Sequence, residues 1–416
     1  MPDPETPSTP DTEAAPSSRS SSAGTVAGGI FASRIAGFLR EGVIAYFFGV
    51  GAHTDALQAA FRGPNLLQNL LGEGTISAAF IPIYSQMLKE DRPRDAGRFA
   101  GAIFGLLLAL TAALVLLGVI FAEPIATVLT PGYVDDAARV AAGELSVNRF
   151  QLVVQAFRLV FPMAGLLVLS AWALGVLNSH RRFFLPYFAP VLWNAAIIGG
   201  LVLAATVGLD APFTDAGAWP VEWLNQLLMA AFVGALAGGA LQFLVQLPLV
   251  VREMKGFRFS LSTRVEGVRE AINAFGPVVA GRGVYQLSGY LDMVLASWLA
   301  AGALAALRPA LMLYILPVSL FGLSVAASEL PELSRLHTAD LSPFLRRLRR
   351  SMRQTLFLTV PTLVGYLAFG FLIVGALFRR GAFGVADNVL VYAVLGGYAL
   401  GLIATTISRL LQNAFY

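Results

Sequence analysis

A row of polar and charged side chains recurs along an otherwise apolar stretch near residues 54–88. Its members are spaced by three or four residues and comprise Asp55, Gln58, Arg62, Asn65, Asn69 and Glu73. On a helix, this spacing confines them to about 80° of arc. A charge inside a membrane-spanning helix costs at least about 2.5 kcal/mol on insertion scales, so it normally faces protein or water and marks a function. The row predicts a polar surface inside a membrane that can bind a charged solute.

The preceding apolar stretch adds three charges, Arg34, Arg40 and Glu41, which fall within about 120° of arc together with Ser33 and Gly37. Guanidinium groups stay charged and bind phosphate oxygens bidentately, which suits an anionic solute. We favour a hydrated cavity over the alternative that these charges pair only to fix helix packing.

Two further cations are candidates for the same surface. Arg158 lies four residues before Pro162. A role in binding the solute and a purely structural role are equally supported for it. Arg282 shares about 120° of its predicted helix with Tyr285, Gln286, Gly289 and Asp292.

Asp292 could hold a coupling cation such as Na⁺, or it could pair with an arginine, which we favour. For Glu329 and Glu332, beside Pro331, a solvated helix end is the preferred interpretation.

No catalytic constellation is found. The chain has no cysteine, and its three histidines, His53, His180 and His337, fall in predicted loops without metal-ligand spacing. Asp135 and Asp136 are interpreted as loop acids, because no second acidic motif accompanies them. No connection is long enough to fold into an active-site domain. The chain is therefore predicted to be a transporter rather than an enzyme, without a cofactor but with Na⁺ or the membrane potential as candidate driving forces.

The elements that position these side chains are predicted to be membrane-spanning helices. Of the 416 residues, 56% are hydrophobic and only 13% are charged, so the chain is too apolar for a soluble protein. A spanning helix needs about 20 mainly apolar residues. About ten such segments can be placed, near 24–50, 54–88, 95–121, 145–177, 184–208, 224–251, 268–300, 306–334, 350–378 and 387–414.

The connections differ in charge from one side to the other. Basic residues gather in 89–98, 180–182, 252–269 and 346–353, whereas 123–139 and 210–223 are acidic. The positive-inside rule then places the N-terminus and the basic connections in the cytoplasm, and it explains the net charge of +4 without a nucleic-acid partner. Residues 1–23 are rich in Pro, Ser, Thr and acids and are predicted to be a disordered tail.

A weak internal repeat predicts two pseudo-symmetric lobes around a central cavity. Residues 77–85 resemble 326–334, and residues 37–52 resemble 289–303, an offset of about 250. Six helices precede the second copy, so both halves have the same topology. We predict an all-α polytopic membrane protein with a six-helix lobe at 24–252 and a partial lobe of about four helices at 253–416. The incomplete second lobe suggests a piece of a longer chain.

The block SRIAGFLREGVIAYFFGVGAHTDALQAAFRGPNLLQNLLGEGTISAAFIPIYSQ (33–86) closely resembles the MurJ/MviN lipid II flippases of the multidrug/oligosaccharidyl-lipid/polysaccharide exporter superfamily. The likeness continues through TPGY (130–133), GVLNSHRRFFLPYFAPVLWN (175–194), GGALQFLVQLP (238–248) and FGP (275–277). The resemblance implies alternating access, a cationic cavity for a lipid-linked diphosphate, and a place in peptidoglycan synthesis at the bacterial inner membrane. The matching cavity positions are Arg34, Arg40, Glu41, Asp55 and Arg62.

Three features depart from the family pattern. Gln68 and Asn69 stand where relatives carry a basic pair, Leu311 and Met312 replace an Asp-Arg pair, and the sequence ends before an eleventh helix. Arg282 and Arg308 could replace a lost cation. Besides a lipid II flippase, the alternatives are an exporter of another polyprenyl-linked glycan and a non-transporting scaffold for cell-wall synthesis proteins.

Overall fold

The computed structural model describes residues 17–209, 218–319 and 342–415, and within these every regular element is a helix. The first half contains α1 (Ser17–Phe48), α2 (Ala52–Leu71), α3 (Glu73–Ala79), α4 (Ile81–Lys89), α5 (Pro93–Ile120), α6 (Ala122–Leu129), η1 (Pro131–Tyr133), α7 (Asp136–Ala141), α8 (Arg149–Ser179), α9 (Phe184–Leu203), η2 (Ala204–Gly208), α10 (Val221–Leu244) and α11 (Leu247–Glu253). The second contains α12 (Val268–Ser297), α13 (Ala303–Pro317), α15 (Ser342–Phe378), α16 (Val385–Leu400) and α17 (Leu402–Phe415). The predicted all-α fold is confirmed.

The predicted apolar segments correspond to these helices, with three differences. The first helix begins at Ser17, inside the stretch predicted to be disordered. The segment predicted at 54–88 is three helices, because Gly72 leaves the helical conformation and a new helix begins at Ile81, with Pro82 in its first turn. Residues 320–334 of the eighth segment, with Glu329, Glu332 and also His337, lie outside the described residues.

Five described helices are long and apolar enough to cross a membrane: α5, α8, α9 with η2, α10 with α11, and most of α15. A sixth span results if α16 and α17, which meet at a 43° bend, are counted together. Helices α1, α2 and α12, which carry charged side chains, are not among them. In a membrane protein, charges on one face of a helix are typical of a helix that lines a polar path.

Helix α8 lies at the centre of the first half, and 83% of its most apolar stretch is buried. It packs against α2, α5 and α10. Lipid offers no hydrophobic drive for helix association, so close approach at small residues has to hold such helices together. Helices α9 and α10 show this, because a side-chain carbon at Gly234 would lie 2.6 Å from the carbonyl oxygen of Ala196.

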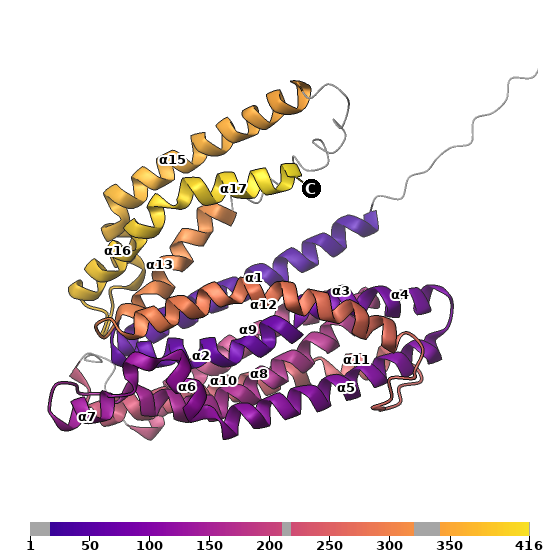
Figure 1. The fold of residues 1–416 in the computed structure, drawn as a ribbon, viewed down its shortest axis with the longest axis horizontal. Helices are drawn as coiled ribbons and strands as arrows, with labels where there is room; N and C mark the ends of the chain where they lie inside the picture. The colour runs from indigo at the N-terminus through magenta and orange to yellow at the C-terminus, as the bar shows by residue number, and fades with distance from the viewer. Residues whose placement is uncertain (1–16, 210–217, 320–341, 416) are drawn as a thin grey trace, which may run out of the picture.

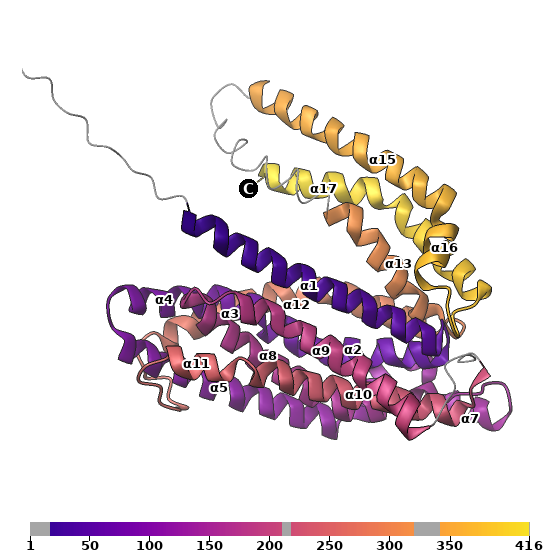
Figure 2. The ribbon, with the colours of Figure 1, turned by 180° about the vertical axis from the view of Figure 1, so that it is seen from behind.

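The described helices form two groups (Figures 1 and 2). Helices α1–α12 lie side by side in one body, and α13 with α15–α17 form a second group that diverges from α1 toward one end of the molecule. The sequence repeat divides the halves at residue 253, yet α12 packs against α2 and α3 of the first half. The division into lobes at 24–252 and 253–416 stays a prediction.

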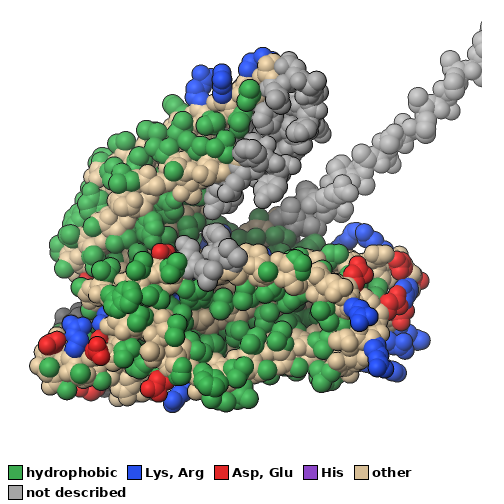
Figure 3. All heavy atoms as spheres, in the orientation of Figure 1, with side chains coloured by type: hydrophobic (Ala, Val, Ile, Leu, Met, Phe, Trp, Pro, Cys, Tyr) green, Lys and Arg blue, Asp and Glu red, His purple; other side chains and the backbone are tan. Residues whose placement is uncertain are grey.

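The two ends of the molecule differ in charge, as the connections predict. The starts of α5 and α15, the end of α11 and the start of α1 lie at one end, and α6 and α7 lie at the other (Figure 1). Figure 3 shows Lys and Arg side chains gathered at the first of these ends of the body and on the tip of α15. We call them the basic end and the acidic end.

His180, at the basic end, is expected to make stability depend on pH. Its Nε2 lies 2.9 Å from the Tyr84 hydroxyl, and burial lowers its pKa, although Glu253 opposes this change. As pH falls below about 6.5, the unfolded chain takes up a proton that the folded chain resists, so stability declines. Thermal unfolding midpoints at pH 7.5 and 5.5 should differ less for His180→Gln than for the parent. Equal differences would contradict this interpretation of His180.

Candidate functional site

Two adjoining cavities open among the helices of the first half. The larger, about 510 Å³, is lined by residues of α1, α2, α3, α8, α9 and α10, and the smaller, about 210 Å³, by residues of α1, α2, α8 and α9. They adjoin because both are lined by Arg40, Gln68, Leu167, Trp193 and Arg308. Arg308 of α13 is the contribution of the second half among the described residues. The cavity predicted to lie between two pseudo-symmetric lobes is thus lined mainly by the first half.

A charge triad stands where the two cavities meet. Glu41 Oε1 lies 2.6 Å from Arg40 Nη2 and 3.3 Å from Arg308 Nε. Arg40 and Glu41 are buried, at 7% and 6% exposure, whereas the Arg308 side chain is 54% exposed. The Arg40 guanidinium also lies over the Trp193 ring, 4.9 Å from its centroid, which adds a cation–π attraction.

The triad carries an excess of positive charge. Two guanidinium groups share one carboxylate, and the buried Nε of Arg40 has no hydrogen-bond partner among the described residues. A buried donor without a partner costs about 1–3 kcal/mol. An anion that reaches this point is attracted by the excess positive charge and can accept a hydrogen bond from the free Nε donor.

The cavities also collect other residues of the predicted polar surface. Arg34 and Glu73 line the larger cavity, and both are exposed. Gln58 and Asn65 line the smaller one. In the described part of the chain, the carboxylates that border these cavities are those of Glu41 and Glu73.

Several predicted site residues lie elsewhere. Arg62 Nη1 donates to the carbonyl of Gly289 at 3.1 Å, and Arg282 Nη1 donates to the carbonyl of Asn69 at 3.3 Å. Both bonds join α2 to α12 outside the two cavities. Arg158 is exposed on α8 and lines neither cavity. The side chain of Tyr285 lies outside the described part of the structure.

Arg282 and Glu73 are nonetheless neighbours. Their charges interact, and a side chain at Gly74, next to Glu73, would meet the Arg282 guanidinium. The lack of a side chain at Gly74 in α3 therefore makes room for an arginine beside a cavity residue.

Asp292, the tentative sodium ligand, is exposed on α12 and interacts electrostatically with Arg62. Among residues 17–209, 218–319 and 342–415, no group of three His, Asp or Glu side chains could hold a metal ion. A hard cation needs several oxygen ligands. The sodium role of Asp292 stays a prediction.

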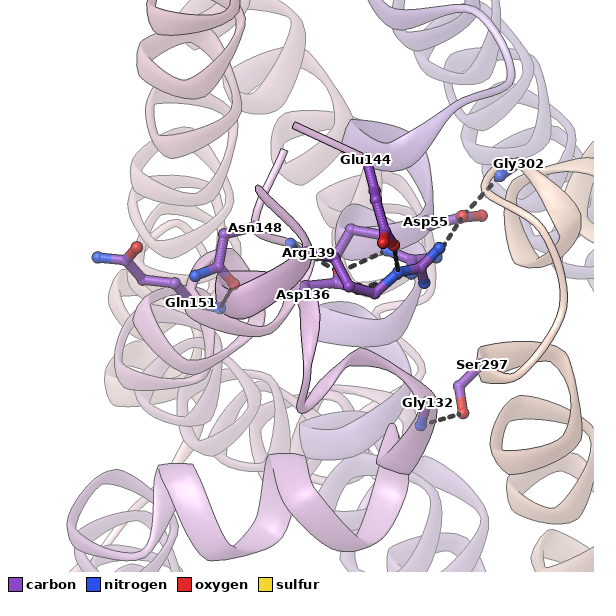
Figure 4. A network of polar contacts seen from close by, with 10 residues as sticks. Asp55, Gly132, Asp136, Arg139, Glu144, Asn148, Gln151, Ser297 and Gly302 are labelled. Atoms are coloured by element: carbon purple, nitrogen blue, oxygen red, sulfur yellow. Dashed lines mark hydrogen bonds and ion pairs between the residues drawn. The ribbon is translucent and has the colours of Figure 1, made fainter. Parts of the chain in front are cut away.

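Asp55 lies in a closed network at the acidic end (Figure 4). It is 1% exposed, and its carboxylate accepts from the backbone N–H groups of Gly302, at 2.6 Å, and Ala305, at 2.8 Å. These groups lie at the start of α13, where a helix has unpaired N–H groups and a positive dipole end. Asp55 therefore caps a helix of the second half from a helix of the first.

Arg149 extends this network into the first half. Its guanidinium lies 3.6 Å from Asp55 and binds both carboxylate oxygens of Asp136, at 2.7 and 2.9 Å. Nearby, the Gly132 N–H donates to Ser297 Oγ at 3.1 Å, a further bond between the halves. We call Asp55, Asp136, Arg149 and the start of α13 the acidic-end closure.

Two predictions about polar residues are wrong here. Asp136, predicted to be a loop acid, is fully buried against Arg149. His53, predicted to be a solvated loop residue, is 6% exposed in α2 and lies 2.9 Å from the Asn225 amide oxygen. In both cases the residue lies in the first turn of a helix rather than in a connection, His53 in α2 and Asp136 in α7.

Sequence reasoning missed most of the cavity wall beyond the first two segments. Trp193 and Asn194 of α9, Gln242 of α10 and Ser170 of α8 line the larger cavity. They are single polar or aromatic residues in apolar runs, without periodic spacing. Arg308 carries a signal that these residues lack, a charge within the predicted segment 306–334, and we predicted it only as a substitute for a lost cation.

The comparisons with known proteins agree with this architecture. The sequence profile of the family described as lipid II flippase MurJ matches residues 44–416. The chain is 32% identical to a probable lipid II flippase MurJ of Rhizobium tropici, over 94% of this chain and 69% of that protein. It is 31% identical to the lipid II flippase MurJ of Burkholderia cenocepacia, over 94% of this chain and 72% of the relative.

Solved structures point the same way. A lipid II flippase MurJ in an inward closed conformation superposes with a TM-score of 0.72 at 25% identity, covering 94% of this chain and 75% of that one. A multidrug resistance transporter of the MATE family, in an inward-facing conformation, shares the fold alone, with a TM-score of 0.55 at 15% identity. The chain is a multi-pass membrane protein that belongs to the MurJ family of lipid II flippases.

Proposed function

We propose that this protein moves lipid II, a polyprenyl-diphosphate-linked muropeptide, from the cytoplasmic to the outer leaflet of the bacterial inner membrane. The observation that carries this proposal is the cationic cavity, where Arg34, Arg40 and Arg308 face a shared space inside a membrane protein. A diphosphate carries at least two negative charges and cannot cross about 30 Å of hydrocarbon without compensating cations.

In this proposal the triad exchanges partners. In the empty cavity Glu41 balances Arg40 and Arg308. A diphosphate competes for the two guanidinium groups and takes the free Nε of Arg40, because charge-assisted bonds to phosphate are among the strong ones. Glu41 reclaims the arginines when the diphosphate leaves, which favours release as well as capture.

Access alternates between the two ends. The acidic-end closure joins the halves, and the helices of the second group diverge from α1 toward the basic end (Figures 1 and 2). With the basic connections in the cytoplasm, this arrangement admits substrate from the cytoplasmic leaflet. Breaking the closure would open the cavity to the other side. Coupling to Na⁺ or to the membrane potential remains part of the proposal.

The direct test is rescue of bacteria depleted of their own lipid II flippase. We expect the protein to restore growth and the appearance of lipid II in the outer leaflet. A protein that inserts normally and restores neither would contradict the proposal, and binding to cell-wall synthesis proteins without transport would then favour a scaffold.

A further inference from the structure

The larger cavity has a charged part and an uncharged part. Its charged residues come from α1, α3 and α13, and they are Arg34, Arg40, Glu73 and Arg308. Every residue that α8, α9 and α10 contribute to its lining is uncharged. We call the polar and aromatic residues of this second part the neutral wall, which consists of Ser170, Tyr187, Trp193, Asn194 and Gln242. A diphosphate needs the charged part, so the neutral wall can bind another part of the same substrate.

Asn194 presents an unused hydrogen-bond acceptor to this cavity. Its side chain is 4% exposed, and its Nδ2 donates to the Pro190 carbonyl of its own helix at 2.9 Å. The buried Oδ1 has no hydrogen-bond partner among the described residues. It faces α1 across the cavity, because a side-chain carbon at Gly37, which also lines the cavity, would lie 3.9 Å from it. Since leaving a buried acceptor unpaired is unfavourable, a ligand hydroxyl that donates to Oδ1 would be stabilised.

The Ser170 hydroxyl is held in place by two glutamines. Gln246, whose side chain is 1% exposed, donates from Nε2 to Ser170 Oγ at 2.7 Å, and Gln242 Nε2 donates to the same oxygen at 3.3 Å. Because the oxygen accepts both bonds, its own hydrogen can donate to a ligand in the cavity. The neutral wall therefore offers a fixed donor as well as an acceptor.

Two aromatic rings accompany these polar groups along α9. Trp193 is the neighbour of Asn194, and the Arg40 guanidinium lies over its ring. Tyr187 lies two turns nearer the basic end, beside Gly29 of α1. The C–H groups of a sugar ring carry partial positive charge and pack on the negative face of an aromatic ring, and its hydroxyls both donate and accept. Rings, a donor and an acceptor without charge suit a sugar better than a second anion.

We propose that the neutral wall binds the sugar ring attached to the diphosphate and determines which head groups the cavity accepts. This proposal rests on the proposed function, since a diphosphate bound at the charge triad brings its sugar to the wall. Trp193 connects the two parts, because it lines both cavities and its ring centroid lies 4.9 Å from the Arg40 guanidinium. A site that hydrogen-bonds substrate hydroxyls disfavours an analogue that lacks them, because its own polar groups then stay unpaired. The triad thus supplies the attraction for the diphosphate, and the neutral wall supplies selectivity.

The test is native mass spectrometry of the purified full chain with three lipids that share one polyprenyl chain. They are undecaprenyl diphosphate, the same lipid carrying a single N-acetylglucosamine, and lipid II. We expect both sugar-bearing lipids to be retained about tenfold more tightly than undecaprenyl diphosphate. Asn194→Leu and Ser170→Ala should each lower this ratio about threefold, and the double variant should bring it to about one. Arg40→Ala should weaken all three lipids and keep the ratio.

Matched controls are available on the same protein. Asn388 of α16 is 1% exposed, donates from Nδ2 to the Phe371 carbonyl at 3.1 Å and, like Asn194, has an unpaired Oδ1 within the described part of the chain. It lines neither cavity, and neither does Ser179 of α8, which donates to the Gly175 carbonyl. Asn388→Leu and Ser179→Ala should therefore keep the tenfold ratio.

The outcomes separate this proposal from the proposed function. If the parent protein retains all three lipids equally, the neutral wall does not select for a sugar, although the diphosphate cavity stands. If the parent retains none of them, the proposed function fails as well. A higher affinity for lipid II that the N-acetylglucosamine lipid does not share would also overturn the proposal, by assigning the wall to the peptide. Equal losses in the control variants would show that removing a polar side chain disturbs the fold rather than the sugar.

Discussion

Arg40→Ala is expected to abolish rescue of flippase-depleted cells while leaving membrane insertion intact. Arg40 supplies the buried cation of the triad and its free Nε donor. Losing charge-assisted bonds of about 1.5–3 kcal/mol corresponds to diphosphate binding weakened about ten- to hundredfold. Glu41 would then pair with Arg308 only, and the triad would keep no excess positive charge. The measurements are growth rescue and outer-leaflet lipid II at matched protein levels.

The chain provides two controls for this experiment. Arg40→Lys keeps the charge but loses the bidentate geometry, so it should retain part of the activity. Arg158→Ala removes an exposed arginine of α8 that lines neither cavity, and it should rescue like the parent. If Arg158→Ala fails while Arg40→Ala succeeds, the diphosphate path lies on another face of the first half.

Asp55→Ala is expected to open the acidic end. It removes the cap of α13 and the more distant of the two carboxylates beside Arg149, and it leaves the N–H groups of Gly302 and Ala305 unpaired. A lost cap costs about 1–2 kcal/mol and a buried unpaired donor about 1–3 kcal/mol. A combined cost of about 3 kcal/mol shifts the equilibrium between the closed and the open acidic end about a hundredfold toward the open form.

Distances between spin labels can report this opening, because the chain has no cysteine of its own. Val134 lies in the body formed by α1–α12 and Val385 begins α16 in the second group, and both are exposed, so cysteines there place labels on opposite sides of the closure. The Asp55→Ala variant should show a new population at longer distance. Asp135→Asn, at the exposed residue beside buried Asp136, should not. Unchanged distances in Asp55→Ala would show that the cap does not hold the halves together.

The periodic polar residues illustrate what sequence can predict about such a site. Insertion into lipid costs free energy for each charged side chain, so a single charge inside an apolar segment already indicates a functional role. Helical spacing then assigns Arg40 and Glu41 to one polar side of α1, and the structure places both on the cavity wall. Ten apolar segments and the alternation of basic and acidic connections follow equally from local composition.

Spacing along one helix, however, says nothing about which neighbour a polar side chain meets. Asp55 and Arg62 share a stripe with Asn65, yet Asp55 caps α13, Arg62 bonds to α12, and only Asn65 of the three lines a cavity. The positions of α13 and α12 against α2 decide these outcomes.

Hydrophobicity and helical period are local properties of the chain, so they suffice to predict a helical membrane protein with buried charges suited to an anion. They do not predict that Arg308 joins Arg40 and Glu41 or that Asp136 is buried against Arg149, which follows from the folded arrangement of the helices. Those pairs are 267 and 13 residues apart in sequence (308 − 41 and 149 − 136). Their meeting depends on how whole helices pack, which no local pattern encodes.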